Sequence, residues 1–396
     1  MAADNPAGSD STSRVVAIYR TQILPLSETF VRDQALALAR WRPVLVGERA
    51  IGALPLGNLA VSTLYSGQPT LTQRLSGLAF RRLDLPRPGM RGLMRQVRPL
   101  LIHAHFGFDG VEAWPVARRL GLKLLVTLHG SDVTTRMDWF ASGRAGRRWK
   151  HYPARLARLA QQEQVSFAAV SENIRQAAIA NGLPPQRIHV QRIGIDTTQF
   201  QRTGRPIAER GKVILFLGRL VEKKGARILI DAFVRLRASL PDAELVIAGD
   251  GPERPALEAQ AAGLPSVRFV GAFSRPQAQA LLGEARVFCL PSVTADSGDA
   301  EGLPLVILEA QASGVPVVTS ARGGATEGIL DGHTGFAFAE HDVAALTAHL
   351  IRVLTDDDLA SAMSAAGPAY VAIQHDLAGN TAALERLYDR VAGLAP

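Results

Sequence analysis

The stretch KVILFLGRLVEKKGARILIDAFVRLRASLPDAELVIAGDGP, residues 212–252, places a short apolar run, a helical segment and a second apolar run one after another. The apolar runs over 212–220 and 243–252 are almost continuously hydrophobic, which is typical of parallel strands covered by helices on both faces. The segment over 226–240 has the length and composition of the helix between them. We interpret the stretch as one strand–helix–strand unit of a parallel sheet.

The same alternation runs through both halves of the chain. Further strands are predicted over 14–20, 43–49, 100–106, 123–130, 165–171, 266–273, 285–292 and 315–320. The pattern predicts an α/β protein of two Rossmann-like, doubly wound domains in series that face each other across a cleft. We expect a disordered tail (1–13), an acceptor-side domain (14–200), a nucleotide-binding domain (201–375) and a terminal helix (376–396) that packs back on the first domain.

Charge supports the boundary between the domains. The chain has 396 residues, 47% of them apolar, and a net charge of +8, but residues 1–205 carry +15 and residues 206–396 carry −7. Segment 74–98 holds seven arginines and one acidic residue, and segment 144–158 holds six basic residues and no acidic one. Because apolar residues are interleaved with these cations, an anionic membrane surface is one predicted partner, and a merely solvated basic face is the alternative.

Composition excludes several classes of protein. The apolar stretches fall short of the roughly 20 residues that span a bilayer, and there is no basic leader followed by an apolar run, so we expect a soluble protein. One cysteine, Cys289, allows neither an internal disulfide nor a cysteine-based zinc site, and its apolar neighbours favour a core thiol. Aromatic residues are only 6% of the chain, and no nucleic-acid-binding motif is present, so no nucleic-acid partner is expected.

Two cations and a helix start converge where the strand over 212–220 ends. Arg219 and Lys224 flank the turn, and Gly225 precedes the helix. Free N–H groups at a helix start, together with a guanidinium and an ammonium group, suit a diphosphate. Lys223 is the less certain member of the lysine pair. Neither the P-loop pattern nor a G-x-G-x-x-G turn between a strand and a helix is found at the start of either domain.

The segment DAEGLPLVILEAQASGVP, residues 299–316, places two glutamates eight positions apart. Pro304 suits the first turn of a helix, which puts Glu301 in the preceding loop and Glu309 in the second turn. That helix is apolar nearly all round, so the Glu309 carboxylate needs a hydrogen-bond donor. A ribose diol fits, and a structural ion pair is the alternative. Glu301 can point into the cleft.

Polar strand ends also line the first domain. His129 lies at the end of the strand over 123–130 and precedes a glycine, where a ligand can approach the backbone closely, so we predict it to be a site residue. His103 and His105 share one side of a strand, and we interpret His103 as a core residue because no carboxylate cluster completes a metal site. Possible acceptor or sugar contacts are Ser27, Glu28, Thr29, His105 and Asp132, all of which lie at strand ends or at a capped helix start.

These motifs together resemble the retaining glycosyltransferases of family four, which have the GT-B fold. The resemblance is carried by FLGRLVEKKG, IAGDGPERPALE, FVGAFSRPQ, PSVTADSGDAEGLPLVILEAQASGVPVVTS and GGATEGILDGHTG in the second half. PLSETFVRDQ, HAHFG, LHGSDV and IGIDTTQF match in the first half and the linker. The SETF opening and the long loop before Glu301 are most similar to exopolysaccharide glycosyltransferases of the colanic-acid and amylovoran type.

The resemblance implies a role for each motif residue. Arg219 and Lys224, with the N–H groups of Gly302 and Leu303, would bind the nucleotide diphosphate. Glu309 would bind the ribose, Glu301 would bind hydroxyls of the transferred hexose, and His129 would lie beside the reaction centre. His129, Glu301, Arg219 and Lys224 form the predicted catalytic set. No D-x-D motif is evident at a strand end, so we expect transfer without a metal or any other cofactor.

The resemblance also implies partners and a location. The donor would be a UDP- or GDP-sugar, and the acceptor would be a polyprenyl-diphosphate-linked glycan in exopolysaccharide or cell-surface polysaccharide synthesis. The protein would be cytoplasmic and peripheral on the inner face of the membrane. A non-hydrolysing nucleotide-sugar epimerase of the same fold and a basic nucleic-acid-binding protein stay open as alternatives. Interconversion of sugars without acceptor would favour the first, and salt-sensitive DNA binding without nucleotide-sugar binding would favour the second.

Overall fold

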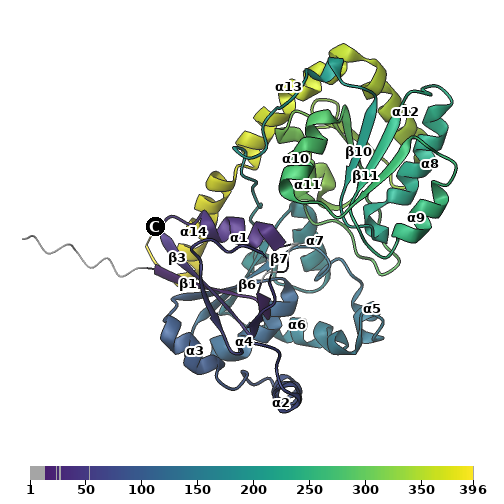
Figure 1. Ribbon diagram of the computed structural model, residues 1–396. Coiled ribbons are helices and arrows are strands. Elements are labelled where there is room, and N and C mark those ends of the chain that lie inside the picture. The colour runs from purple at the N-terminus through teal and green to yellow at the C-terminus, as the bar shows by residue number, and fades with distance from the viewer. Residues whose placement is uncertain (1–13, 24, 26–27, 53, 396) are drawn as a thin grey trace, which may run out of the picture.

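The computed structural model describes residues 14–23, 25, 28–52 and 54–395. Ser27 and the predicted tail over 1–13 lie outside the described residues. The described chain forms two α/β domains, each built on one parallel sheet (Figure 1). Within these residues, no helix has both the length and the apolar character needed to cross a membrane.

The amino-terminal sheet has seven strands in the order β5-β3-β1-β6-β7-β8-β9. Its strands are β1 (Arg14–Tyr19), β3 (Trp41–Gly47), β5 (Ala60–Thr63), β6 (Leu101–His105), β7 (Lys123–Leu128), β8 (Val165–Ala169) and β9 (Ile188–Val190). Every pairing is parallel, with Ala17 opposite Val44 on one side and Ile102 on the other. The short strands β2 (Gln22–Ile23) and β4 (Arg49–Ala50) pair separately. The order reverses at β1, so ligand groups are expected beyond the carboxyl ends of β1 and β6.

The carboxyl-terminal sheet has six parallel strands in the order β12-β11-β10-β13-β14-β15. They are β10 (Val213–Leu217), β11 (Glu244–Ala248), β12 (Val267–Gly271), β13 (Val287–Leu290), β14 (Val317–Ser320) and β15 (Gly335–Phe338). Cys289 is buried in β13, which confirms it as a core thiol. Two doubly wound domains were predicted, and the two parallel sheets confirm that prediction. The predicted strands are all present, whereas the short pair β2 and β4 and the edge strands β5, β9 and β15 were missed.

Helices surround both sheets. In the amino-terminal domain they are α1 (Thr29–Leu36), α2 (Leu71–Arg82), α3 (Met90–Val97), α4 (Gly107–Leu120), α5 (Met137–Ala141), α6 (Tyr152–Ala160) and α7 (Glu172–Ala180). In the second they are α8 (Ala226–Arg237), α9 (Arg254–Gln260), α10 (Arg275–Glu284), α11 (Leu305–Ala312), α12 (Val343–Thr355) and α13 (Asp357–Gln374). Gly225, which begins α8, has a φ of 69°, and a Cβ there would lie 1.8 Å from the Pro291 carbonyl oxygen, so this turn requires glycine.

The last helix, α14 (Leu377–Ala392), returns to the amino-terminal domain, as Figure 1 shows. Its Leu384, Leu387 and Tyr388 are buried in a core cluster with side chains of β1, β3 and β6. The Tyr388 hydroxyl lies 2.7 Å from Nδ1 of His103, whose Nε2 lies 2.6 Å from the Thr127 hydroxyl. Burial lowers the pKa of His103 to about 3, so this imidazole is neutral. The interpretation of His103 as a core residue is confirmed.

Two carboxylates fasten α14 to the start of β3. Glu385, which is 2% exposed, accepts hydrogen bonds from the backbone N–H groups of residues 39–41 at 2.9, 2.6 and 3.0 Å. Asp389 accepts a hydrogen bond from the indole N–H of Trp41 at 3.0 Å and forms ion pairs with Arg14 and Arg40. These contacts join the end of the chain to the first domain.

We expect Glu385→Ala to lower the free energy of unfolding by about 1–3 kcal/mol, because the buried N–H of Trp41 loses its acceptor. Urea unfolding followed by tryptophan fluorescence measures this difference. Glu385→Gln retains an acceptor oxygen and is the control. Equal losses in both variants would contradict the role of Glu385 as a backbone acceptor.

Candidate active site

The candidate site lies where loops at the carboxyl ends of strands from both domains meet. In the carboxyl-terminal domain, the loop after β10 contains the short 3-10 helix η5 (Glu222–Lys224), and the loop after β13 leads to α11. In the amino-terminal domain, the ends of β1, β6 and β7 carry Arg20, His105 and His129. This is the edge at which open parallel sheets hold their ligands.

A lysine and a glutamate pair across the two loops of the carboxyl-terminal domain. Nζ of Lys224 lies 2.8 Å from Oε1 of Glu301, whose side chain is 7% exposed. Beside this pair, Nζ of Lys223 lies 3.1 Å from Oδ2 of Asp299. Burial alone would raise the pKa of Glu301, but the charges of Lys224 and Lys223 outweigh it and hold that pKa below its usual value. Glu301 is therefore a carboxylate at neutral pH.

The remaining cation of this group is more open. Arg219 follows β10 with an exposed side chain. Burial alone would lower the pKa of Lys223, but the charges of Glu301 and Asp299 outweigh burial and raise it. The nearby charge of Arg219 opposes that rise. Arg219 thus lies within electrostatic range of Lys223. Three cations and two carboxylates leave this group with a net positive charge, which favours an anionic ligand.

At Gly302 the backbones of the two domains come into close contact. A Cβ at this position would lie 1.8 Å from the carbonyl oxygen of His129, so residue 302 must be glycine for the loops to approach this closely. The hydroxyl of Ser171 donates a hydrogen bond to the Gly302 carbonyl oxygen at 2.9 Å. Leu303, the next residue, packs against the cores of both domains.

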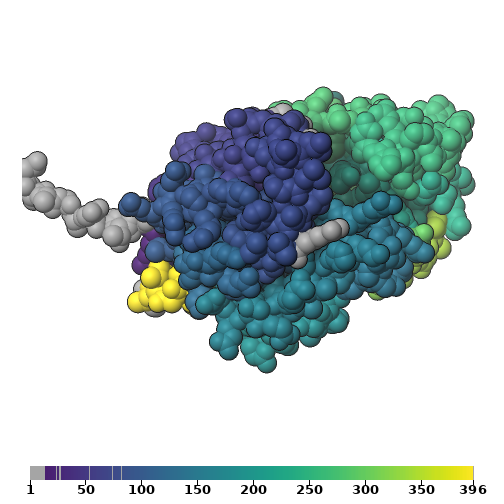
Figure 2. Space-filling model, turned by 90° about the horizontal axis from the view of Figure 1, so that it is seen from below, coloured from purple at the N-terminus to yellow at the C-terminus, as the bar shows by residue number. Residues whose placement is uncertain are grey.

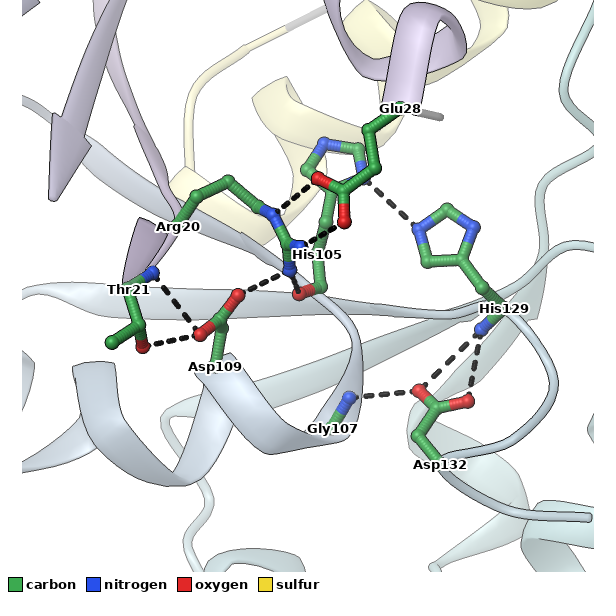
Figure 3. A network of polar contacts seen from close by, with 8 residues as sticks. All are labelled: Arg20, Thr21, Glu28, His105, Gly107, Asp109, His129 and Asp132. Carbon is green, nitrogen blue, oxygen red and sulfur yellow. Dashed lines mark hydrogen bonds and ion pairs between the residues drawn. The ribbon is translucent and has the colours of Figure 1, made fainter. Parts of the chain in front are cut away.

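On the other side of the cleft, Arg20 holds two buried carboxylates (Figure 3). Its Nε donates to Oε2 of Glu28 at 3.0 Å, and its Nη1 donates to the His105 carbonyl oxygen at 2.8 Å. Further contacts join Arg20 to Oε1 of Glu28 and to Asp109. Asp109 also accepts the backbone N–H of Thr21 at 3.1 Å. Burial raises the pKa of both carboxyl groups, and the Arg20 charge opposes that rise.

Two histidines stack next to this network. Nδ1 of His105 lies 3.0 Å from Nε2 of His129, and their ring centroids are 5.2 Å apart. The half-buried His129 ring also contacts Phe30 and Phe106. Burial and the nearby Arg20 charge hold the pKa of both imidazoles well below the usual value, so both rings are neutral at pH 7. His129 can offer a hydrogen bond to a ligand but not a charge.

Asp132 is directed at the backbone. It is fully buried and accepts hydrogen bonds from the N–H groups of Gly107 at 2.7 Å and His129 at 3.2 Å (Figure 3). It also accepts a hydrogen bond from the N–H group of Gly130 at 2.9 Å. These bonds fix the end of β7 against the start of α4. Of the other predicted acceptor contacts, Glu28 and His105 belong to the Arg20 network, and Thr29 lies at a separate cavity.

That cavity is narrow and lies between the domains, beside Glu309. It is lined by Thr29 and Asp33 of α1, Arg275 of α10 and the half-buried Glu309 of α11. Nη2 of Arg275 donates to Oδ2 of Asp33 at 2.7 Å, which forms an ion pair between the domains. Burial raises the pKa of Glu309 to about 7, an effect that Arg275 opposes and Asp33 reinforces. No described residue donates a hydrogen bond to the Glu309 carboxylate.

The structure thus brings Lys224, Glu301 and Gly302 together with His129, and it adds residues that sequence reasoning missed. Arg20 follows directly after a strand whose last five residues, 15–19, are buried and hydrophobic, and this position was the signal for it. Asp109, Asp33 and Arg275 lie within or at the start of helices, where a charged residue is ordinary. Nothing in the local pattern distinguishes these three residues from solvated ones.

We expect Arg20→Met to lower the free energy of unfolding by about 3–5 kcal/mol at pH 7, because Glu28 and Asp109 become buried without a cation. The loss should be smaller at pH 5. Both carboxyl groups have raised pKa values, so without Arg20 they protonate readily as the pH falls. Protonation removes the unpaired buried charges and restores part of the stability of the variant. Urea unfolding at the two pH values tests this. Arg175→Met, which breaks a surface pair, should change stability by less than about 1 kcal/mol.

Comparison with known proteins follows the two domains. The family of glycosyl transferases group 1 matches residues 197–370, and glycosyltransferase family 4 matches residues 28–199. The putative colanic acid biosynthesis glycosyltransferase WcaL of Salmonella typhimurium is 31% identical over 255 residues, 62% of this chain and 59% of that protein. The amylovoran biosynthesis glycosyltransferase AmsK of Erwinia amylovora is 32% identical over 254 residues, 63% and 60% of the two chains. The matches thus span about six tenths of these relatives' length.

A relative with a different activity matches equally well, and solved structures share the fold. A glycogen synthase of Mycobacterium tuberculosis is 32% identical over 277 residues, 68% of this chain and 64% of that protein. Anabaena Alr3699/HepE in complex with UDP and glucose aligns with a TM-score of 0.73 at 18% identity, covering 95% of this chain and 99% of that chain. WaaG, a glycosyltransferase involved in lipopolysaccharide biosynthesis, aligns with a TM-score of 0.68 at 19% identity, covering 96% and 100%.

Proposed function

The chain belongs to the family-four glycosyltransferases, and we propose that it transfers a hexose from a UDP- or GDP-sugar to a lipid-linked oligosaccharide with retention of configuration. The observation that carries the proposal is the Lys224–Glu301 pair, whose glutamate lies in the loop that touches His129 through Gly302. A cation for phosphate and a carboxylate for sugar hydroxyls therefore lie side by side, next to a contact between the domains. UDP-glucose in a complex of Alr3699/HepE supports the class of donor.

Each charged group has a place in this reaction. Arg219 and Lys224 would bind the diphosphate and stabilise the charge that develops as it departs, with the N–H groups of Gly302 and Leu303 nearby. Glu301 would accept hydrogen bonds from the hexose, and Glu309 from the ribose. The neutral His129 would contact the sugar without placing another cation beside the anomeric carbon. The acceptor hydroxyl would attack the same face that the phosphate leaves, and the departing phosphate would take its proton.

A hollow of about 230 Å³ in the amino-terminal domain supports the acceptor assignment. Arg20, Glu28 and Asp109 line one part of it, and Phe106, Phe108, Trp149, Arg148, Thr21, Gln22 and Ser131 complete the wall. Apolar ring surfaces with a few converging polar groups are typical of sites for small polar ligands. The guanidinium of Arg148 lies over the Trp149 ring at 4.7 Å, and both belong to the basic segment 144–158.

The likeness to WcaL and AmsK favours a role in exopolysaccharide or cell-surface polysaccharide synthesis. A lipid-linked acceptor of that kind would place the protein at the inner face of the cytoplasmic membrane. A thermal-shift panel of UDP, GDP and their sugars identifies the donor, and product analysis with acceptor tests transfer. Interconversion of a UDP-sugar without acceptor would instead indicate an epimerase. Retention of activity in chelator would support transfer without a metal.

We expect Lys224→Ala to lower the rate of transfer by about 10²–10³-fold and to reduce the thermal shift by UDP or GDP, because the departing diphosphate loses a cation. Lys212→Ala is the matched control, since Lys212 precedes the same strand at its other end and pairs with Asp242 on the surface. Full transfer activity in the Lys224 variant would refute the assignment of Lys224 to the diphosphate.

Nucleotide affinity should strengthen as the pH rises from about 6 to 8, because Glu309, with a pKa of about 7, ionises over this range. A carboxylate accepts ribose hydroxyl hydrogen bonds better than a protonated carboxyl group does, so binding lowers this pKa and affinity rises with pH. Isothermal titration at several pH values measures the slope. The slope should vanish in Glu309→Gln, and an unchanged slope would show that another group is responsible.

A further inference from the structure

Helix α2 exposes its apolar face. Leu71, Leu75 and Leu78 are 72%, 56% and 52% exposed. Spacings of four and three residues place these side chains on one stripe of a helix. Leu83, just beyond the helix, is 67% exposed. A surface helix of a soluble domain normally turns such a stripe towards the core, so the orientation of α2 needs an explanation.

The orientation is fixed by polar contacts on the other side of α2. Gly77 is buried, and a Cβ there would collide with the guanidinium of Arg87, whose Nε lies 2.6 Å from Oε1 of Glu48. Nε of Arg81 lies 2.7 Å from Oε1 of Glu112 on α4. Rotation of the leucines inwards would break the Arg81–Glu112 pair and would turn larger side chains of α2 into the Arg87 guanidinium that now lies against Gly77. The exposed stripe is therefore built into the fold.

The arginines of the basic segments 74–98 and 144–158 are of two kinds, those in buried ion pairs and those exposed at the surface. Arg81, Arg87 and Arg155 neutralise Glu48 and Glu112 inside the domain. Exposed cations remain on α3 and its end and around α6, namely Arg91, Arg95, Arg98, Arg144, Arg147, Arg148, Lys150 and Arg158. In Figure 1, α2 stands at the lower end of the amino-terminal domain, and Figure 2 views the molecule from that side.

We propose that α2 docks the protein on an anionic lipid bilayer, with the leucines of the stripe entering the interface while the exposed arginines contact lipid phosphates. This inference rests on the proposed lipid-linked acceptor. An apolar stripe bordered by cations is the pattern by which helices lie on anionic membranes. The acceptor hollow shares Arg148 with the basic segment 144–158, so docking would bring a lipid-linked sugar near the cleft.

A second copy of the chain fits this surface less well. In a symmetric dimer the same patch faces itself, so the exposed arginines of the two copies would be brought together. One helical stripe also offers little area compared with the roughly 1,200–2,000 Å² of a stable interface. A bilayer with negative phosphates meets the same cations with attraction instead of repulsion.

The test is co-sedimentation with vesicles of equal parts phosphatidylglycerol and phosphatidylcholine, without donor or acceptor. We expect the triple variant Leu71→Ser, Leu75→Ser, Leu78→Ser to bind at least about tenfold more weakly than the unchanged protein, because three apolar side chains leave the interface. The matched control is Leu330→Ser with Ile373→Ser, which removes exposed apolar residues of the other domain that are 48% and 77% exposed. This control should bind like the unchanged protein, and phosphatidylcholine alone should bind weakly.

A labelled variant tests insertion directly. Cys289 is buried, so Leu78→Cys can be labelled selectively with an environment-sensitive dye, and its emission should shift to the blue on the anionic vesicles. The same dye at Leu330→Cys should not shift. Equal vesicle binding by the stripe and control variants, or equal emission at the two labelled sites, would overturn the proposal. The proposal would also be overturned if the unchanged protein did not bind vesicles and formed a dimer in light scattering, whereas the stripe variant was monomeric.

Failure of this inference is distinguishable from failure of the proposed function. The stripe variant should keep its thermal shift with nucleotide sugar and its transfer to an acceptor analogue without the lipid, because α2 takes no part in the site. Stripe-dependent vesicle binding without any transfer would refute the proposed function but leave the docking surface standing. Transfer by an unchanged protein that does not bind vesicles would support the proposed function and refute the docking surface.

Discussion

The structure depends on one close approach between the two domains, where the backbone of Gly302 meets the carbonyl oxygen of His129. Because no side chain fits between them, the loop with Glu301 lies directly against the strand end that carries His129. Ser171 reinforces this contact through the Gly302 carbonyl, and Leu303 anchors the next residue in both cores. The relative positions of the carboxylate, the lysines and the imidazole follow from this backbone contact.

The two sides of the cleft balance charge in opposite ways. In the carboxyl-terminal domain, Lys223, Lys224 and Arg219 outnumber Asp299 and Glu301, and the excess cation suits an anionic donor. In the amino-terminal domain, Glu28 and Asp109 outnumber Arg20, and the histidines beside them are neutral. This group has no excess cation, so it would not compete with the carboxyl-terminal domain for the phosphates, and its polar groups can form hydrogen bonds with sugar hydroxyls.

The sequence predicted the central strands because they are buried on both faces and therefore continuously apolar. β5 was missed because it is a short edge strand with exposed or half-exposed residues. β9 and β15, each at the edge of its sheet, were missed because they have only three and four residues. Local spacing also predicted Glu301 in a loop and Glu309 on a helix. It could not predict that Glu301 pairs with Lys224, or that Asp132 bonds to backbone N–H groups, because those partners meet only in the fold.

The ion pair between Asp33 and Arg275 gives the cleft a property that neither domain has alone. It joins α1 to the start of α10 beside Glu309, so it holds the domains together at the place assigned to the ribose. The cavity there is narrow, and a nucleotide that enters it must displace or share these charges. Loss of the Asp33 contact would free Arg275 to approach the Glu309 carboxylate and favour its ionised form, in which it binds hydroxyls best. Domain opening and the protonation state of Glu309 would then be coupled through Arg275.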